Sequence, residues 1–181
     1  MAGTSDTELW DEWYASEGAH GPVWSGRPNA ALVAEVGGLQ PGSALDIGCG
    51  EGADAIWLAR RGWRVTAIDP ARSALDRAAA AARAAGVEVE WVRAGLLDLP
   101  TLRTSDEATS VDPAAYDLVA AHYAVLPRTR TAVDVLLGAV AEGGTLLVVH
   151  HEGMREYAGA PATRGPRPAS PGRGARRRRR G

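Results

Sequence analysis

The stretch that decides the fold is Leu45-Asp46-Ile47-Gly48-Cys49-Gly50-Glu51-Gly52-Ala53. A short apolar run ends in the carboxylate of Asp46, three glycines follow at alternate positions, and a helical pattern begins at Ala53. Glycine has no Cβ atom, so the backbone can turn sharply at these positions and approach a ligand closely. The helix start adds free N–H groups and the positive end of the helix dipole. The stretch therefore predicts a strand, a ligand-binding loop and a helix, in that order.

A second acid supports a nucleotide-type cofactor. Asp69 stands at the end of the next apolar run, 23 residues after Asp46. An acid at this place is suited to accept hydrogen bonds from ribose hydroxyls. Because Gly48-x-Gly50-x-x-Ala53 also satisfies the dinucleotide fingerprint, the pattern alone leaves open a nicotinamide-dependent oxidoreductase.

The charge of the loop favours a different cofactor. Asp46, Glu51 and Asp54 would repel a pyrophosphate, whereas S-adenosylmethionine carries a sulfonium, an ammonium and only one carboxylate. At ~4 Å and an effective dielectric constant of ~20, one such charge contact contributes about 4 kcal/mol before desolvation. The acidic loop therefore indicates the cationic methyl donor.

These residues carry a family resemblance. Asp46-x-Gly48-x-Gly50-x-Gly52 resembles the first motif of class I S-adenosylmethionine-dependent methyltransferases, and the run from about Trp24 to His151 is similar to that family. Within it, Trp24-Ser25-Gly26-Arg27-Pro28-Asn29 and the run 62–69 resemble small bacterial members of the thiopurine and tellurite-resistance type. The resemblance implies methyl transfer to a small-molecule acceptor by in-line displacement. A degenerate, non-catalytic cofactor-binding domain is the alternative.

Strand and helix patterns alternate along the chain, which predicts an α/β, Rossmann-like, doubly wound and mostly parallel sheet of about five strands. The expected strands are 43–47, 64–68, 87–92, 116–120 and 145–150. The expected helices are 6–17, 30–36, 53–61, 73–85 and 131–141, with an irregular loop over 101–113. Ser73 and Asp76 are expected to cap the fourth helix. The family sheet has two further C-terminal strands, and no strand pattern follows residue 157, so an aberrant or truncated C-terminus without that hairpin is expected.

Composition divides the chain into three parts. We expect an N-terminal helical segment (1–28), the cofactor-binding methyltransferase domain (29–158) and a disordered Pro/Gly/Arg-rich tail (159–181). The tail holds eight Arg and no acid, so residues 1–158 hold twelve Arg against twenty-two acids, a net charge of −10. An acidic body argues against a nucleic-acid-binding core. The tail is either a solvated segment or an arm that makes weak contacts with anions.

The family resemblance implies which residues contact the cofactor. Asp46 is expected to orient the methionyl ammonium, Asp69 to bind the ribose and Arg27 to pair with the carboxylate. The family often has an acid that contacts adenine, but Gly95 stands at that position here, so Leu96, Leu97 or the nearby Asp98 would take its place. The full expected set is Trp24, Arg27, Asp46, Gly48, Cys49, Gly50, Gly52, Asp69, Pro70, Gly95, Leu96 and Leu97.

Catalysis requires little from the protein, because the sulfonium is already a good leaving group. His122 and Tyr123 follow the fourth expected strand, and His122 is the candidate general base, since histidine titrates near neutral pH. Cys49 is a less favoured candidate for a nucleophile. Neighbouring residues on a strand point to opposite faces, so the run His150-His151-Glu152 does not predict a metal site, and none is expected.

Composition also bears on the compartment. One cysteine excludes an internal disulfide and suits a reducing environment. No apolar run approaches the ~20 residues of a membrane span, and the polar N-terminus has no signal-peptide pattern. We therefore expect a cytoplasmic protein with no membrane partner.

Overall fold

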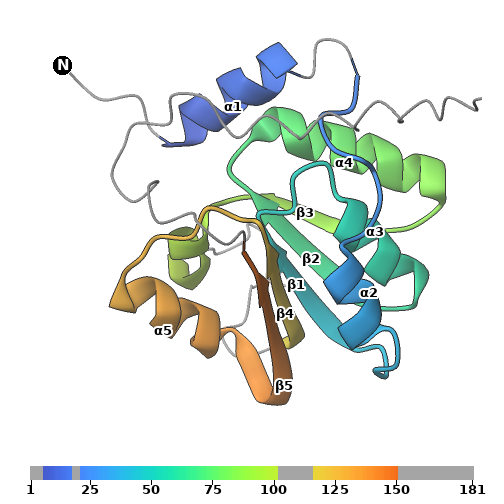
Figure 1. The fold of residues 1–181 in the computed structure, drawn as a ribbon, viewed down its shortest axis with the longest axis vertical. Helices are drawn as coiled ribbons and strands as arrows, with labels where there is room; N and C mark the ends of the chain where they lie inside the picture. Colours follow the sequence, from blue (N-terminus) through green and yellow to red (C-terminus); the bar gives the residue numbers. More distant parts are fainter. Residues whose placement is uncertain (1–5, 18–20, 102–115, 151–181) are drawn as a thin grey trace, which may run out of the picture.

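The computed structural model describes residues 6–17, 21–101 and 116–150. Its centre is one five-stranded sheet in the order β3-β2-β1-β4-β5, with every neighbouring pair parallel (Figure 1). The strands are β1 (Ser43–Ile47), β2 (Arg64–Asp69), β3 (Glu90–Arg93), β4 (Tyr116–His122) and β5 (Val140–Val149). The predicted α/β, doubly wound, parallel sheet of five strands is confirmed.

Helices cover both faces of the sheet. Figure 1 shows α2 (Ala30–Val36), α3 (Ala53–Arg60) and α4 (Arg72–Ala85) on one side, and α5 (Arg130–Gly138) with the 3₁₀ helix η2 (Leu96–Thr101) on the other. The alternation of side chains along the strands explains this arrangement. On β4, for example, Leu118 and Ala120 pack with α2 and α3, while Val119 and Ala121 pack with α5 and η2.

The N-terminal helix α1 (Asp6–Glu17) matches the predicted range and lies over α4 in Figure 1. Its aromatic side chains face the domain: Tyr14 is buried against Ala71 and Ala74, and Trp10 and Trp13 pack beside it. The side chain of Asp11 accepts from the Ser73 N–H at 3.2 Å and pairs with Arg93 at 2.7 Å. The helix is therefore attached to the start of α4 and the end of β3.

Several predicted boundaries are wrong for identifiable reasons. Ser73 does not cap α4: the helix begins at Arg72 after Ala71, and Asp11 of α1 accepts the Ser73 N–H instead. Strand β3 begins at Glu90 rather than 87, and α5 ends at Gly138 rather than 141. Strand β5 begins at Val140 rather than 145. Its pairing with β4 shifts register after Val140, and Gly143 and Gly144 lie within this shift.

Some expectations concern residues that are not described. The irregular loop, apart from its start, and the tail after residue 150 lie outside the described ranges, as do His151 and Glu152. The three-part division of the chain therefore remains a prediction. Among the helices of residues 6–17, 21–101 and 116–150, none is long and apolar enough to cross a membrane.

Candidate functional site

The glycine loop joins β1 to α3 at the edge of the sheet where the strands end. Gly48, Gly50 and Gly52 have φ values of 69°, 53° and 80°, in the left-handed region that favours glycine. A Cβ atom on Gly48 would lie 2.6 Å from Cβ of Ala124, and one on Gly50 would lie 2.8 Å from the Tyr14 hydroxyl. Side chains at these positions would therefore separate the loop from the segment after β4 and from α1.

Asp69 at the end of β2 is fastened to the loop. Its Oδ2 accepts from the Gly50 N–H at 2.9 Å, and its Oδ1 accepts from the Ala71 N–H at 2.9 Å. The side chain is buried, and burial raises its pKa although these two hydrogen bonds oppose the rise. The structure places the carboxylate beside the glycine loop, as expected, but both oxygens already bind backbone donors.

Asp46 at the end of β1 is also buried, with 2% exposure. The Ala55 backbone N–H binds its carboxylate, but Oδ2 has no hydrogen-bond partner among the described residues. Burial raises its pKa well above the ordinary value of 3.8, and the charges of Asp54 and Asp69 raise it further. The site therefore contains one buried acid whose charge is not compensated by any neighbouring group of residues 6–17, 21–101 and 116–150.

Asp54 and His122 form a pair that the sequence analysis did not predict. Oδ2 of Asp54 lies 2.8 Å from Nδ1 of His122, and Oδ1 accepts from the Asn29 N–H at 2.6 Å. His122 is the last residue of β4 rather than a residue after it, and its side chain is 4% exposed. The two residues are 68 positions apart, so no local pattern could have indicated this contact.

Glu51 is not directed at a phosphate or a cofactor charge. Its carboxylate accepts from the N–H groups of Val23 and Trp24, each at 3.1 Å, and pairs with Arg77 at 3.0 Å. The charge argument from the sequence counted Glu51 and Asp54 as free acids, and both have partners here. Of the three acids, Asp46 is the one to which the charge argument against a pyrophosphate still applies.

The N-terminal segment covers the loop. Trp24 is 45% exposed, its Nε1 donates to the Tyr14 hydroxyl at 2.8 Å, and its ring packs against Trp13. Arg27 is exposed, and no ion pair of its side chain is found among residues 6–17, 21–101 and 116–150. Trp24 therefore lies against the glycine loop, and Arg27 is available to an anion.

The segment after β3 is shaped by its own contacts. The Gly95 N–H donates to Oδ2 of Asp98 at 2.8 Å, which gives Asp98 a structural role in starting η2. Leu96 is buried in the core below α5, whereas Leu97 is 45% exposed. Of the two leucines expected near adenine, Leu97 is the one with a free surface. The Pro70 carbonyl, also in the expected set, accepts from Arg93 at 3.1 Å.

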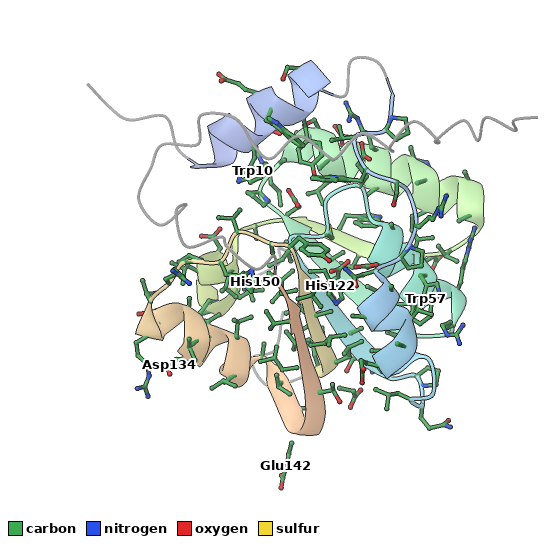
Figure 2. The ribbon with its side chains drawn as sticks, viewed as in Figure 1. Trp10, Trp57, His122, Asp134, Glu142 and His150 are labelled. Atoms are coloured by element: carbon green, nitrogen blue, oxygen red, sulfur yellow. The ribbon has the colours of Figure 1, made fainter. Side chains whose placement is uncertain are left out.

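The remaining candidates have weaker support. Burial raises the pKa of the Cys49 thiol well above its ordinary value, which disfavours the reactive thiolate. His150, labelled in Figure 2, is exposed just after β5. One polar atom from each of Asp46, Asp54 and His122 lies within 4.8 Å of the others, a cluster with the composition of a metal site.

The cluster lies where the strand order reverses. Strand β1 pairs with β2 on one side and β4 on the other, and ligands of open α/β sheets bind at this switch point. Asp46 and His122 both project to the α3 side of the sheet, and Figure 2 shows His122 at the end of the strands. A buried acid and a histidine at this place suit a ligand that carries a positive charge.

Comparison with known proteins identifies the domain. The profile of a family described as a methyltransferase domain matches residues 44–144, more than half of the chain. An uncharacterized methyltransferase of Mycobacterium tuberculosis is 38% identical over 109 residues, which is 58% of this chain and 48% of that protein. The chain therefore spans about half the length of the curated relatives it matches.

Solved structures have the same fold. A protein studied for the conversion of a disulfide bond into a thioacetal group during echinomycin biosynthesis aligns with a TM-score of 0.60 and 32% identity, over 75% of this chain and 55% of that one. A methyltransferase of Thiobacillus denitrificans in complex with S-adenosylhomocysteine aligns with a TM-score of 0.53 and 22% identity, over 76% and 54%. With the profile match over residues 44–144, the chain belongs to the methyltransferase-domain family, and it has the fold of class I S-adenosylmethionine-dependent methyltransferases.

Proposed function

We propose that this chain binds S-adenosylmethionine at the ends of β1, β2 and β4 and transfers its methyl group to a small-molecule acceptor. The observation that carries the proposal is the buried Asp46 carboxylate beside three left-handed glycines at the switch point of the sheet. A cation compensates this charge, whereas a pyrophosphate would raise its energy further.

The cofactor is supported by family membership and by the S-adenosylhomocysteine complex of the Thiobacillus protein. The ribose hydroxyls would bind the second lone pair of each Asp69 oxygen, beside the backbone N–H that each already accepts, and Arg27 would pair with the donor carboxylate. A small-molecule acceptor is supported by the similarity to the protein of echinomycin biosynthesis. When bound, the donor supplies an activated methyl group, so this chain has to hold donor and acceptor in line and exclude water.

A thermal-shift series with S-adenosylmethionine, S-adenosylhomocysteine and NAD tests the cofactor. A ligand at ~100 times its Kd stabilises the folded state by about 2.7 kcal/mol, which for a chain of this size raises Tm by about 5–10 °C. We expect this shift with the first two ligands only. A shift with NAD alone would contradict the proposal.

Transfer is tested separately from binding. We expect release of S-adenosylhomocysteine when the protein is incubated with the donor and a panel of phenols, thiols and amines. Donor binding with no turnover of any acceptor would leave a cofactor-binding domain and would contradict the enzymatic part of the proposal.

A further inference from the structure

The two edges of the sheet differ in how well they resist pairing with another chain. Figure 1 shows β3 at one edge and β5 at the other, each with one neighbouring strand in the part of the chain that the structure describes. Strand β3 has 4 residues and carries Glu90 and Arg93, and short, charged edge strands resist further pairing. Strand β5 has 10 residues, and its regular part, 145–149, holds no charged residue, glycine or proline. The β5 edge therefore has the features of a strand that accepts another strand.

The backbone groups that β5 presents at this edge follow from its pairing with β4. The Val149 carbonyl accepts from the Tyr123 N–H at 2.8 Å, so Val149 directs its backbone groups toward β4. The N–H and C=O of one strand residue point to the same side, and neighbouring residues alternate. The odd-numbered residues of 145–149 therefore bond to β4. Leu146 and Val148 direct their N–H and C=O groups toward the open edge.

The rest of this sequence offers no apolar strand for the edge. Residues 151–181 follow β5 outside the described ranges, and they contain one Tyr but no Val, Ile, Leu, Phe or Trp. Residues 102–115 contain one Leu, one Val and three acids. Strands favour β-branched and aromatic residues. A second copy of the chain, by contrast, offers an edge with the same apolar composition.

Two copies of β5 complement each other in an antiparallel register centred on Leu147. A two-fold axis perpendicular to the sheet places Leu147 opposite its own copy and Leu146 opposite Val148 of the other copy. Because Leu146 and Val148 are the residues with outward backbone groups, they form the hydrogen-bonded pairs, and each of these N–H and C=O groups finds a partner. A parallel arrangement would relate the copies by a translation, which does not close.

The side chains also match in this register. Leu146 packs with the α5 side of the core and Leu147 with the α3 side. Alternation along the strand puts Val148 on the same face as Leu146, so these two apolar side chains meet across the seam on one face. On the other face, Leu147 meets its own copy. No charged side chain of 145–149 is brought into contact with a like charge.

We propose that this chain forms a two-fold symmetric homodimer through the edge of β5, which joins the two sheets into one. The axis brings both copies of α5 to the same face of the joined sheet, where Val133 and Leu137, 49% and 58% exposed, add apolar surface. The assembly closes after two copies, because each copy has one such edge and the β3 edge is short and charged. It does not depend on which cofactor or acceptor the chain binds.

Sedimentation velocity of the full chain at about 1–100 µM tests the dimer, a range that covers micromolar values of Kd. We expect a particle with twice the chain mass of 18.9 kDa. Val148→Lys places a charge at both ends of the seam and should raise the Kd of the dimer at least ~10-fold. Val33→Lys on α2 is the matched control, because Val33 and Val148 are 41% and 39% exposed, and it should leave the Kd unchanged.

Cysteine cross-linking tests the register. Leu147→Cys should form a disulfide-linked dimer under mild oxidation, because the Cβ atoms of two directly opposite residues lie about 4.5–5.5 Å apart. Thr145→Cys should not cross-link, since the register places residue 145 opposite residue 149 of the other copy. Wild type, whose one cysteine is Cys49, should not cross-link either.

The contrary outcomes are distinct. A wild type that stays monomeric at the highest concentration overturns the proposal, and slow hydrogen exchange at Leu146 and Val148 in that monomer would show that a segment of the same chain covers the edge. Particles that grow beyond the dimer would show open aggregation instead of a closed pair. Equal Kd values for Val148→Lys and Val33→Lys would place the interface elsewhere. If circular dichroism shows that Val148→Lys does not fold, the cross-linking decides, and failure of Leu147→Cys to link two chains overturns the proposal.

Discussion

Asp46 is the penultimate residue of β1 and Asp69 the last residue of the neighbouring β2, yet their carboxylates have different surroundings. Both are buried, and burial raises the pKa of both. Asp69 accepts two backbone N–H groups, from Gly50 and Ala71. Asp46 accepts from the Ala55 N–H, and its other oxygen has no partner in the part of the chain that the structure describes. On the β2 side of the site, each oxygen of the acid accepts a backbone N–H, and we call this the completed side. On the β1 side, one oxygen of the acid lacks such a donor.

The difference separates two uses of a buried acid. A satisfied carboxylate stabilises the loop that it binds, and an unsatisfied one destabilises the free protein until a ligand arrives. The completed side is also the side covered by α1, through Tyr14, and by the segment that follows it, through the contacts of Val23 and Trp24 with Glu51. We therefore expect substitutions on the two sides to shift stability in opposite directions.

Asp69→Ala should have the largest effect. It removes the acceptor of two buried N–H groups, each of which costs about 1–3 kcal/mol when left unpaired, and relief of the buried charge offsets part of this loss. We expect the free energy of unfolding in urea to fall by about 2–4 kcal/mol. Asp76→Ala, at an exposed position of α4, is the control and should change it by less than ~0.5 kcal/mol. Equal effects of the two variants would show that the hydrogen bonds of Asp69 do not stabilise the loop, and the difference between the two sides of the site would be contradicted.

Asp46→Asn should stabilise the free protein at neutral pH by about 1–3 kcal/mol, because a neutral amide replaces a buried carboxylate whose Oδ2 has no hydrogen-bond partner among the described residues. The folded pKa of Asp46 lies above its ordinary value of 3.8, so wild type loses stability as the pH rises from 3.8 through the folded pKa. The advantage of the variant should therefore be absent below pH 3.8 and grow over that window. Urea unfolding at a series of pH values measures it.

A variant that is less stable than wild type at every pH would show that Oδ2 of Asp46 also has a structural partner in the free protein. The same substitution is expected to weaken binding of the donor. Higher stability together with weaker binding is the pattern expected of a binding-site residue that lowers the stability of the free protein and is needed for function.

The sequence was sufficient for the parts of the fold that depend on local patterns. Apolar runs and helical periodicity located the strands and helices, and Gly48, Gly50 and Gly52 located the loop, because left-handed backbone requires glycine. Asp46 and Asp69 could be located near the ends of strands because each follows an apolar run in the sequence.

The sequence was insufficient wherever a distant residue completes a local feature. Helix α4 takes its N-terminal acceptor from Asp11, 62 residues before Ser73, so the local capping pattern misplaced its start. Asp54 and Glu51 were treated as free acids because their partners, His122 and Arg77, come from other elements.

Glu51→Gln tests the completed side, with a smaller expected loss of stability than Asp69→Ala. The carboxylate accepts from Val23 and Trp24 and pairs with Arg77, whose side chain is 31% exposed and therefore partly screened by solvent. We expect a loss of about 1–2 kcal/mol in unfolding free energy and a change in tryptophan fluorescence as the N-terminal segment loosens. Glu35→Gln, on the exposed face of α2, is the matched control. Unchanged fluorescence would show that packing alone holds the segment.

Tyr14→Phe should have the smallest effect and separates packing from hydrogen bonding on that side. The substitution keeps the ring that packs against Ala71 and Ala74 and removes the hydroxyl that accepts from Nε1 of Trp24 at 2.8 Å. Trp24 is 45% exposed, so water can replace the lost acceptor, and the loss in urea unfolding should be about 0.5–1 kcal/mol. A loss as large as that of Asp69→Ala would mean that the hydroxyl is the main attachment of α1 to the glycine loop. The stability of the completed side would then depend mainly on one long-range hydrogen bond, and not on the two backbone N–H groups that Asp69 accepts. The difference between the surroundings of Asp69 and Asp46 would then matter less for stability.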